Sequence, residues 1–262
     1  MKHIARKRFG QNFLQDQQVI NSIIAEIAPQ PEDHIIEIGP GLGALTQPLL
    51  NRCHLTLIEL DRDLIPHLNK LNADLTIINA DVLTVNFHQL AKSPHKLRLV
   101  GNLPYNISTP LLFHVFQYCK DIADMHFMLQ KEVAERLVAP ANSSHYGRLS
   151  IMTQYFCEID LLLEVPPQAF NPMPQVQSAI VRLVPHPPQY FSTQNFALFE
   201  TLIRHAFSQR RKTLRNNLKH WLSTSALQTI NEYLSHRPQE LTVNQYISIA
   251  NLLADSCYTP PN

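Results

Sequence analysis

The segment Glu37-Ile38-Gly39-Pro40-Gly41-Leu42-Gly43 decides the fold, because it gathers three of the six glycines of this 262-residue chain within five residues. It ends an apolar run at residues 34–38, which predicts a strand, and precedes a helical pattern from about Ala44. Glycine at a strand-to-helix turn lets the backbone turn tightly and approach a ligand closely. We therefore expect a ligand at the carboxyl end of this first strand.

Short apolar runs alternate with helical patterns on the C-terminal side of this turn. The further expected strands are Leu55–Ile58, Leu75–Ile78, Leu97–Val100, Met125–Leu129, Leu161–Val165 and Ala179–Val184. One helix is expected from about Asp63, and another at residues 108–110, where Thr109 can cap and Pro110 fits the first turn. The alternation over about residues 34–130 predicts an α/β fold with a parallel, doubly wound sheet and helices on both faces. The last two strands are added to it without an expected direction.

A stiff break at Pro185-His186-Pro187-Pro188 ends the α/β pattern. Four helical patterns follow it, at about 194–207, 211–222, 224–235 and 242–254. We therefore predict two domains: an α/β domain over residues 1–188 and a small all-α domain over residues 189–262.

The charge of the chain is unevenly distributed, although its net value is only +1. Residues 1–15 carry four Lys and Arg and no acid, and residues 201–231 carry six and again no acid. Two basic segments on an otherwise acidic body favour a polyanionic partner, with a solvated helix face as the alternative. The candidate phosphate contacts in the second segment are Arg210, Arg211, Lys212 and Arg215. Residues 211 and 215 are expected to share one helix face.

Other classes of protein are disfavoured by composition. The four cysteines, at positions 53, 119, 157 and 257, are widely separated and the thirteen histidines are scattered, so we expect no metal site. No apolar run approaches the about 18 residues that a membrane helix needs, and no apolar stretch follows the basic N-terminus. We expect a cytoplasmic protein that makes no membrane contact.

Dinucleotides and S-adenosylmethionine both bind at such glycine turns. The pattern Gly39-x-Gly41-x-x-Ala44 fits the dinucleotide fingerprint, and Glu59 stands twenty residues after Gly39, where a ribose-binding acid is expected. Glu37 favours S-adenosylmethionine, because its carboxylate would repel a pyrophosphate and attract the ammonium of a methionine moiety. Asp81 follows the third strand and can accept a hydrogen bond from an adenine amine. An NAD-dependent oxidoreductase remains the alternative.

The tetrapeptide Asn102-Leu103-Pro104-Tyr105 follows the fourth expected strand and resembles the (Asp/Asn)-Pro-Pro-(Tyr/Phe/Trp) motif of amino-group methyltransferases. The exocyclic nitrogen of adenine is a poor nucleophile, because its lone pair is delocalised into the ring. The side-chain oxygen of Asn102 can accept one N–H, and a main-chain carbonyl near Leu103 or Pro104 can accept the other. Tyr105 offers a flat face on which the base can stack.

Together these segments resemble the small-subunit (16S) ribosomal RNA adenine N6,N6-dimethyltransferase family over nearly the whole chain. The matching segments are Arg8–Leu14, Glu37–Gly43, Ile58–Asp61, Gly101–Pro110, Leu129–Leu137, Tyr146–Ser150 and Ala169–Pro174. The resemblance implies a Rossmann-like class I methyltransferase sheet and S-adenosylmethionine as cofactor. It also implies dimethylation of two adjacent adenines in a hairpin loop near the 3′ end of that RNA, late in assembly of the 30S subunit. We expect the protein to act as a monomer.

The resemblance also assigns roles to individual residues. The implied cofactor-binding residues are Asn12, Leu14, Glu37, Gly39, Gly41, Glu59, Asp81 and Asn102. Glu59 would bind the ribose hydroxyls and Asp81 the cofactor's adenine, while Tyr105 and Phe170 would sandwich the target base. One departure is that Gln175 and Gln177 stand where the family often has Lys and Asp, which puts a phosphate contact from position 175 in doubt.

Two further alternatives share these motifs. The chain could be an RNA-binding assembly factor that keeps the fold as a scaffold, although the intact Asn102–Tyr105 segment argues against a loss of catalysis. It could also belong to the sister group of large-subunit adenine methyltransferases. The RNA that accepts the methyl group distinguishes the small-subunit enzymes from that group.

Overall fold

The structure is a computed structural model that describes residues 11–72, 74–91, 95–187, 190 and 193–256. The chain forms two compact units, one of residues 1–134 with 158–185 and the other of residues 135–157 with 186–262. The predicted boundary at 188/189 falls on residues outside the described part. Packing places residues 135–157 with the C-terminal helices, whereas the sequence pattern had assigned them to the α/β domain.

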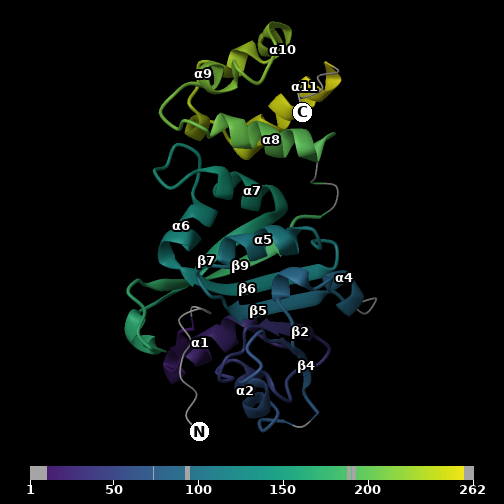
Figure 1. Ribbon diagram of the computed structural model, residues 1–262, viewed down its shortest axis with the longest axis vertical. Coiled ribbons are helices and arrows are strands. Elements are labelled where there is room, and N and C mark those ends of the chain that lie inside the picture. The colour runs from purple at the N-terminus through teal and green to yellow at the C-terminus, as the bar shows by residue number, and fades with distance from the viewer. Residues whose placement is uncertain (1–10, 73, 92–94, 188–189, 191–192, 257–262) are drawn as a thin grey trace. The chain divides into compact units, whose positions relative to one another are not determined.

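The first unit is built on a seven-stranded sheet with the strand order β4-β3-β2-β5-β6-β9-β7 (Figure 1). Its strands are β2 (His34–Ile38), β3 (His54–Ile58), β4 (Thr76–Ile78), β5 (Leu97–Asn102), β6 (Ile122–Gln130), β7 (Cys157–Val165) and β9 (Ser178–Pro185). The five strands from β4 to β6 are parallel, so their carboxyl ends meet at one edge of the sheet.

At the other edge the sheet is mixed, because β9, one of the two strands expected after the alternating segment, runs antiparallel to β6. A parallel connection needs a crossover of about a dozen residues or more, usually a helix. The segment between β7 and β9 contains only a 3₁₀ turn at Pro167–Ala169 and the two-residue strand β8 (Phe170–Asn171). Its turn-rich sequence supplies no crossover helix, so the chain reverses direction there.

The central strands β2, β5 and β6 are buried on both faces, which is why they are apolar nearly throughout, whereas the edge strands β4 and β7 are more exposed. On one face, Ile35, Val100 and Met128 pack in a cluster with helices α1 (Gln17–Ile27) and α2 (Thr46–Leu49). Ile36 and Leu99 point to the opposite face and are also fully buried. The remaining helices of the sheet connections are α3 (Ile65–Leu68), α4 (Phe87–Leu90) and α5 (Ser108–Phe116).

Helix α5 begins at Ser108, where a helix was expected, but its cap differs from the prediction. Ile107 is its N-cap residue, so Thr109 does not cap it. The hydroxyl of Ser108 instead bonds the carbonyl oxygens of Pro104 and Tyr105, at 3.2 and 3.3 Å. The start of α5 is therefore tied to the turn that follows β5.

A second, two-stranded sheet joins the N-terminal segment to the first unit. Its strands are β1 (Phe13–Leu14) and β8, which run antiparallel with Leu14 opposite Phe170. The amide of Gln15 also donates to the carbonyl of Ala169, at 2.8 Å. These contacts fix residues 13–15 although no long strand is formed.

Apart from Cys157, the first residue of β7, the regular structure of the second unit is helical in the residues that the structure describes, as predicted for the C-terminal region. Its helices are α6 (Lys131–Val138, which begins in the first unit), α7 (Arg148–Phe156), α8 (Phe196–Ala206), α9 (Leu214–Leu218), α10 (Thr224–Thr229) and α11 (Val243–Asp255). The rings of Tyr155 on α7 and Phe199 on α8 lie 4.8 Å apart. This aromatic packing explains why α7 groups with the C-terminal helices.

The expected basic helix over residues 211–222 is much shorter in the structure. Helix α9 covers only Leu214–Leu218, and Thr213 before it is extended, with φ −69° and ψ 161°. Arg210, Arg211 and Lys212 lie in a turn that the Lys212 amide closes by donating to the Gln209 carbonyl, at 3.0 Å. Residues 211 and 215 therefore do not share a helix face.

Candidate active site

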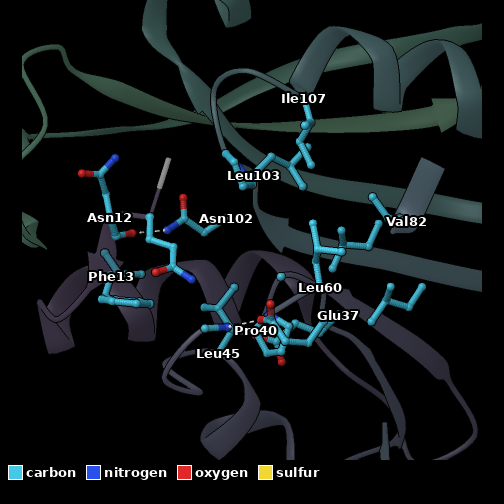
Figure 2. A pocket seen from close by; sticks show the side chains of 18 of the residues that line it. Asn12, Phe13, Glu37, Pro40, Leu45, Leu60, Val82, Asn102, Leu103 and Ile107 are labelled. Atoms are coloured by element: carbon cyan, nitrogen blue, oxygen red, sulfur yellow. Dashed lines mark hydrogen bonds between the residues drawn. The ribbon is translucent and has the colours of Figure 1, made fainter. Parts of the chain in front are cut away.

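A pocket of about 330 Å³ lies at the carboxyl ends of β2, β3, β4 and β5 (Figure 2). Five separate segments line it: Gln11–Leu14, Glu37–Leu45 without Gly43, Ile58–Leu60, Ala80–Val82 and Asn102–Ile107. All eight residues predicted to bind the cofactor are among the lining residues. The structure thus brings together side chains from the N-terminal segment and from four successive strand ends.

The glycine loop allows the chain to approach the pocket closely. Gly39 and Gly41 have φ values of +64° and +59°, a region that side-chain-bearing residues rarely adopt. A Cβ on Gly41 would lie 3.0 Å from a ring carbon of Phe13, which lines the opposite wall. Gly41 therefore packs directly against the Phe13 ring, and the two form a cradle that any side chain at position 41 would push apart.

Gly41→Ala is expected to weaken the binding of S-adenosylmethionine by about tenfold. The left-handed conformation costs an alanine about 1–2 kcal/mol, so the free loop relaxes away from its binding conformation, and the added methyl group presses on the Phe13 ring. Isothermal titration calorimetry measures this change directly. Gly147→Ala is the matched control, since Gly147 is extended at φ −166° and nothing lies within 4 Å of its added Cβ. Equal affinities in the two variants would contradict the role of the cradle.

Glu37 is the most deeply buried acid of the pocket, with 2% of its surface exposed. The hydroxyl of Thr46, on α2, donates to its carboxylate at 2.7 Å. Burial raises the pKa of Glu37 to about 7, and the negative charge of Glu59 adds to this effect. A buried carboxylate with a raised pKa is stabilised in its ionised form when a cationic group of a ligand binds beside it.

Glu59 organises the neighbouring part of the pocket. Its two carboxylate oxygens accept from the amides of Gly41 and Asp61, at 3.2 and 2.8 Å. Each of these oxygens has a second lone pair, which leaves capacity for a ribose hydroxyl. Burial raises the pKa of Glu59. Asp81 is exposed at the pocket wall, where its side chain accepts from the Leu83 amide at 3.0 Å.

Asn102 is the last residue of β5 and lies on the same face of the sheet as Glu37. This follows from the register, because Glu37 pairs with Val100, two residues before it. The side-chain nitrogen of Asn102 donates to the main-chain carbonyl of Asn12, at 2.9 Å (Figure 2). The N-terminal segment therefore fixes the amide with its nitrogen turned to Asn12 and its oxygen turned away.

The two predicted stacking residues differ in their placement. Tyr105 lines the pocket and is half-buried, and its hydroxyl lies 2.9 Å from that of Ser178. Phe170 is not among the lining residues that the described part of the chain contributes. It is 5% exposed and packs in the same cluster as Leu14. A sandwich of the target base between Tyr105 and Phe170 stays a prediction, which requires the Phe170 ring to become accessible.

Several contributors to the site were not identified from the sequence. Phe13 faces the glycine loop, Thr46 holds Glu37, and Ser178 holds Tyr105. Gln11 adds a bond to Asp61, at 3.1 Å. Gln11 and Phe13 carried a signal, as part of the N-terminal motif. The first three residues of that motif, 8–10, lie outside the described residues.

The described residues show neither a metal site nor a membrane span. No cluster of three or more His, Cys, Asp or Glu side chains is arranged to hold an ion in the part of the chain that the structure describes. No helix within the same residues is long and apolar enough to cross a bilayer.

A family model described as "Ribosomal RNA adenine dimethylase" matches residues 2–255. The chain belongs to the ribosomal RNA adenine dimethylase family. It is 52% identical over 258 residues to the ribosomal RNA small subunit methyltransferase A of Pectobacterium atrosepticum, covering 97% of this chain and 95% of that protein. The protein of the same name from Klebsiella pneumoniae is also 52% identical, with 98% of this chain and 96% of the relative covered.

Solved structures agree with this membership. A dimethyladenosine transferase from Plasmodium falciparum superposes with a TM-score of 0.82 at 25% identity, covering 94% of this chain and 98% of that one. The 23S rRNA methyltransferase ErmE shares the fold, with a TM-score of 0.69 at 24% identity over 93% of this chain and all of its own. The resemblance to adenine dimethylases, the Rossmann-like methyltransferase fold and S-adenosylmethionine as cofactor are thereby confirmed. The NAD-dependent oxidoreductase is set aside.

Proposed function

We propose that this protein dimethylates the N6 amines of two adjacent adenosines in a hairpin loop near the 3′ end of small-subunit (16S) ribosomal RNA. It uses S-adenosylmethionine and acts in the cytoplasm, as a monomer, late in assembly of the 30S subunit. The observation that carries the proposal is the Asn102 amide, which Asn12 holds in one orientation inside the glycine-loop pocket.

The pocket residues fit S-adenosylmethionine, which when bound supplies an electrophilic methyl group on a sulfonium. The buried carboxylate of Glu37 suits the ammonium of the methionine moiety, and the open space beside Gly39, where nothing lies within 4 Å of an added Cβ, gives room for close approach. Glu59 and Asp81 are available to the ribose hydroxyls and the adenine, as the family resemblance implies.

Asn102 and one main-chain carbonyl activate the target amine. The Asn102 oxygen accepts one N–H, which draws the nitrogen towards tetrahedral geometry and frees its lone pair. The Pro104 carbonyl already accepts from the Ile107 amide and the Ser108 hydroxyl, at 3.1 and 3.2 Å, which uses both of its lone pairs. The Leu103 carbonyl is therefore favoured as the second acceptor. The methylated nitrogen is acidic and loses its proton to water without a dedicated base.

The test is to incubate the protein with labelled S-adenosylmethionine and small ribosomal subunits that lack the modification, then to map the labelled bases. Two adjacent adenines, each with two methyl groups, in a hairpin loop near the 3′ end are expected. Large ribosomal subunits are incubated in the same way for comparison, because adenine methyltransferases of the sister group modify large-subunit RNA. Label found only in large-subunit RNA, or in none, would overturn the proposal.

The C-terminal region contributes RNA affinity in this proposal, through the turn at residues 210–212. Arg210, Arg211 and Lys212 are all exposed, and the Arg210 guanidinium donates to the Ser143 carbonyl at 3.1 Å. Arg215 bonds Asn231 at 2.9 Å. Exposed cations beside a tight turn can contact successive phosphates without a long helix.

Replacing Arg210, Arg211 and Lys212 with glutamine is expected to weaken RNA binding and to flatten its salt dependence. Each lost phosphate contact lowers the slope of log K against log salt by about 0.7–0.9. Filter binding between low and moderate salt measures the slope. A triple variant of Arg52, Lys70 and Lys120, all exposed in the first unit, removes the same charge elsewhere. An unchanged slope in the first variant would show that the turn at residues 210–212 does not contact RNA phosphates.

A further inference from the structure

Tyr105 is attached to the protein at two points. Its backbone lies in the turn after β5, which is fixed where the Leu103 amide donates to the Met128 carbonyl at 3.1 Å. Its ring ends at the hydroxyl, which lies 2.9 Å from the Ser178 hydroxyl. The two residues are 73 positions apart in the chain. A tyrosine held at its backbone and at its hydroxyl keeps the direction of its long axis, whereas a ring held only by its backbone can swing about χ1.

Ser178 is well suited to hold the far end of this ring. It is the first residue of β9, is 0% exposed, and pairs in the sheet with Gln130 of β6. The residue before it is also fixed, because the Lys131 amide donates to the Gln177 carbonyl at 2.9 Å. A buried serine needs a hydrogen-bond partner, and the Tyr105 hydroxyl provides one.

Base stacking alone does not explain the tyrosine. A phenylalanine or tryptophan at position 105 would present an equal or larger face to a base, and amine activation falls to Asn102 and a main-chain carbonyl. The hydroxyl of Tyr105 points to a serine of the central sheet, so its contribution is geometric. Reactions of this kind depend strongly on the alignment of the two reacting centres.

We propose that Ser178 is a positioning residue for methyl transfer, which fixes the long axis of the Tyr105 ring and hence the place at which the target adenine is held. The inference rests on the proposed function, because it assumes that an adenine stacks on Tyr105. The bond between the two hydroxyls does not take part in the chemistry. It limits the angles at which the exocyclic amine can meet the Asn102 oxygen.

The test compares Ser178→Ala, Tyr105→Phe and the double variant in the full-length protein with small-subunit RNA. Each single variant removes the same hydrogen bond and is expected to lower kcat by about three- to tenfold. The KM for RNA and the Kd for S-adenosylmethionine should stay nearly constant, because phosphate contacts and the glycine-loop pocket are untouched. The double variant should lose no more than either single one, since both act through one bond.

Thr56→Val is the matched control for the loss of a buried hydroxyl. Thr56 lies on β3 of the same sheet, is 7% exposed, and bonds only through its hydroxyl to the His34 ring at 3.0 Å among the side-chain bonds described. It does not line the active-site pocket as the described residues define it. This variant is expected to lower the melting temperature and leave kcat unchanged, which separates positioning from stability.

A 2-aminopurine placed at the target position gives a second readout, because its fluorescence is quenched on stacking. Both single variants should show weaker quenching than the wild type at saturating RNA. Tyr105→Phe removes only the hydroxyl and is expected to fold even if Ser178→Ala does not. If Tyr105→Phe kept the kcat and the quenching of the wild type, the positioning role would be overturned. A wild-type protein that binds RNA but transfers no methyl group would overturn the proposed function instead.

Discussion

Asn102→Ala is expected to lower kcat by about 10²–10³-fold, the usual cost of removing one preorganised acceptor or donor from a reacting centre. The alanine keeps the β5 backbone in place but removes both the acceptor for the adenine amine and the bond to the Asn12 carbonyl. The Kd for S-adenosylmethionine should change only a few-fold, because Glu37, Glu59 and the glycine loop remain. Single-turnover methyl transfer and calorimetry measure the two effects separately.

The control is Asn102→Asp, which keeps an oxygen in the acceptor position. The motif that this segment resembles accepts either residue, so methyl transfer should survive at a reduced level. The loss in this variant has a clear cause, because a carboxylate cannot donate to the Asn12 carbonyl and is repelled by it. Full activity in the alanine variant, or a large loss of cofactor binding there, would contradict the assignment of Asn102.

The part of the site that could be predicted lies within short segments whose chemistry is local. The glycine loop, the acid at Glu59 and the Asn102–Tyr105 tetrapeptide each combine a strand end with side chains suited to one ligand group. Parallel strands bring their carboxyl ends to one edge, so predicting the strands was enough to bring these residues together. In the structure these segments line one pocket.

The remainder depended on contacts between distant residues. Ser178 carries no local sign that it meets Tyr105, and Thr46 none that it meets Glu37. The reversal of β9 depends on the absence of a crossover helix, and the grouping of α7 with α8 depends on aromatic packing between Tyr155 and Phe199. The helical pattern of residues 211–222 predicted a basic helix that is too long, because sequence periodicity does not reveal the turn at residues 209–212.

Glu37→Gln is expected to stabilise the protein without ligand at pH 8 by as much as about 3 kcal/mol, since each pKa unit corresponds to about 1.4 kcal/mol. Burial raises the pKa of Glu37 from 4.5 to about 7, so the folded state binds a proton that the unfolded state has released. Wild-type stability therefore falls as pH rises from about 4.5 to about 7 and is lowest relative to the glutamine variant above that range. Urea unfolding at pH 4.5 and pH 8 should show nearly equal stabilities at the lower pH and the full difference at the higher one.

The same substitution is expected to weaken S-adenosylmethionine binding by about 10²-fold or more, because a buried ion pair loses about 3–5 kcal/mol when one partner is removed. The wild-type affinity should rise towards about pH 7 as Glu37 ionises, and binding below that pH should release a proton that calorimetry in buffers of different ionisation enthalpy detects. The glutamine variant should show neither effect, although the Thr46 hydroxyl can still donate to its amide oxygen. A wild-type affinity independent of pH between 5 and 7 would mean that the ammonium binds elsewhere. The opposite signs of the two effects follow from one cause: the carboxylate that destabilises the ligand-free fold when ionised is the group that the ammonium neutralises.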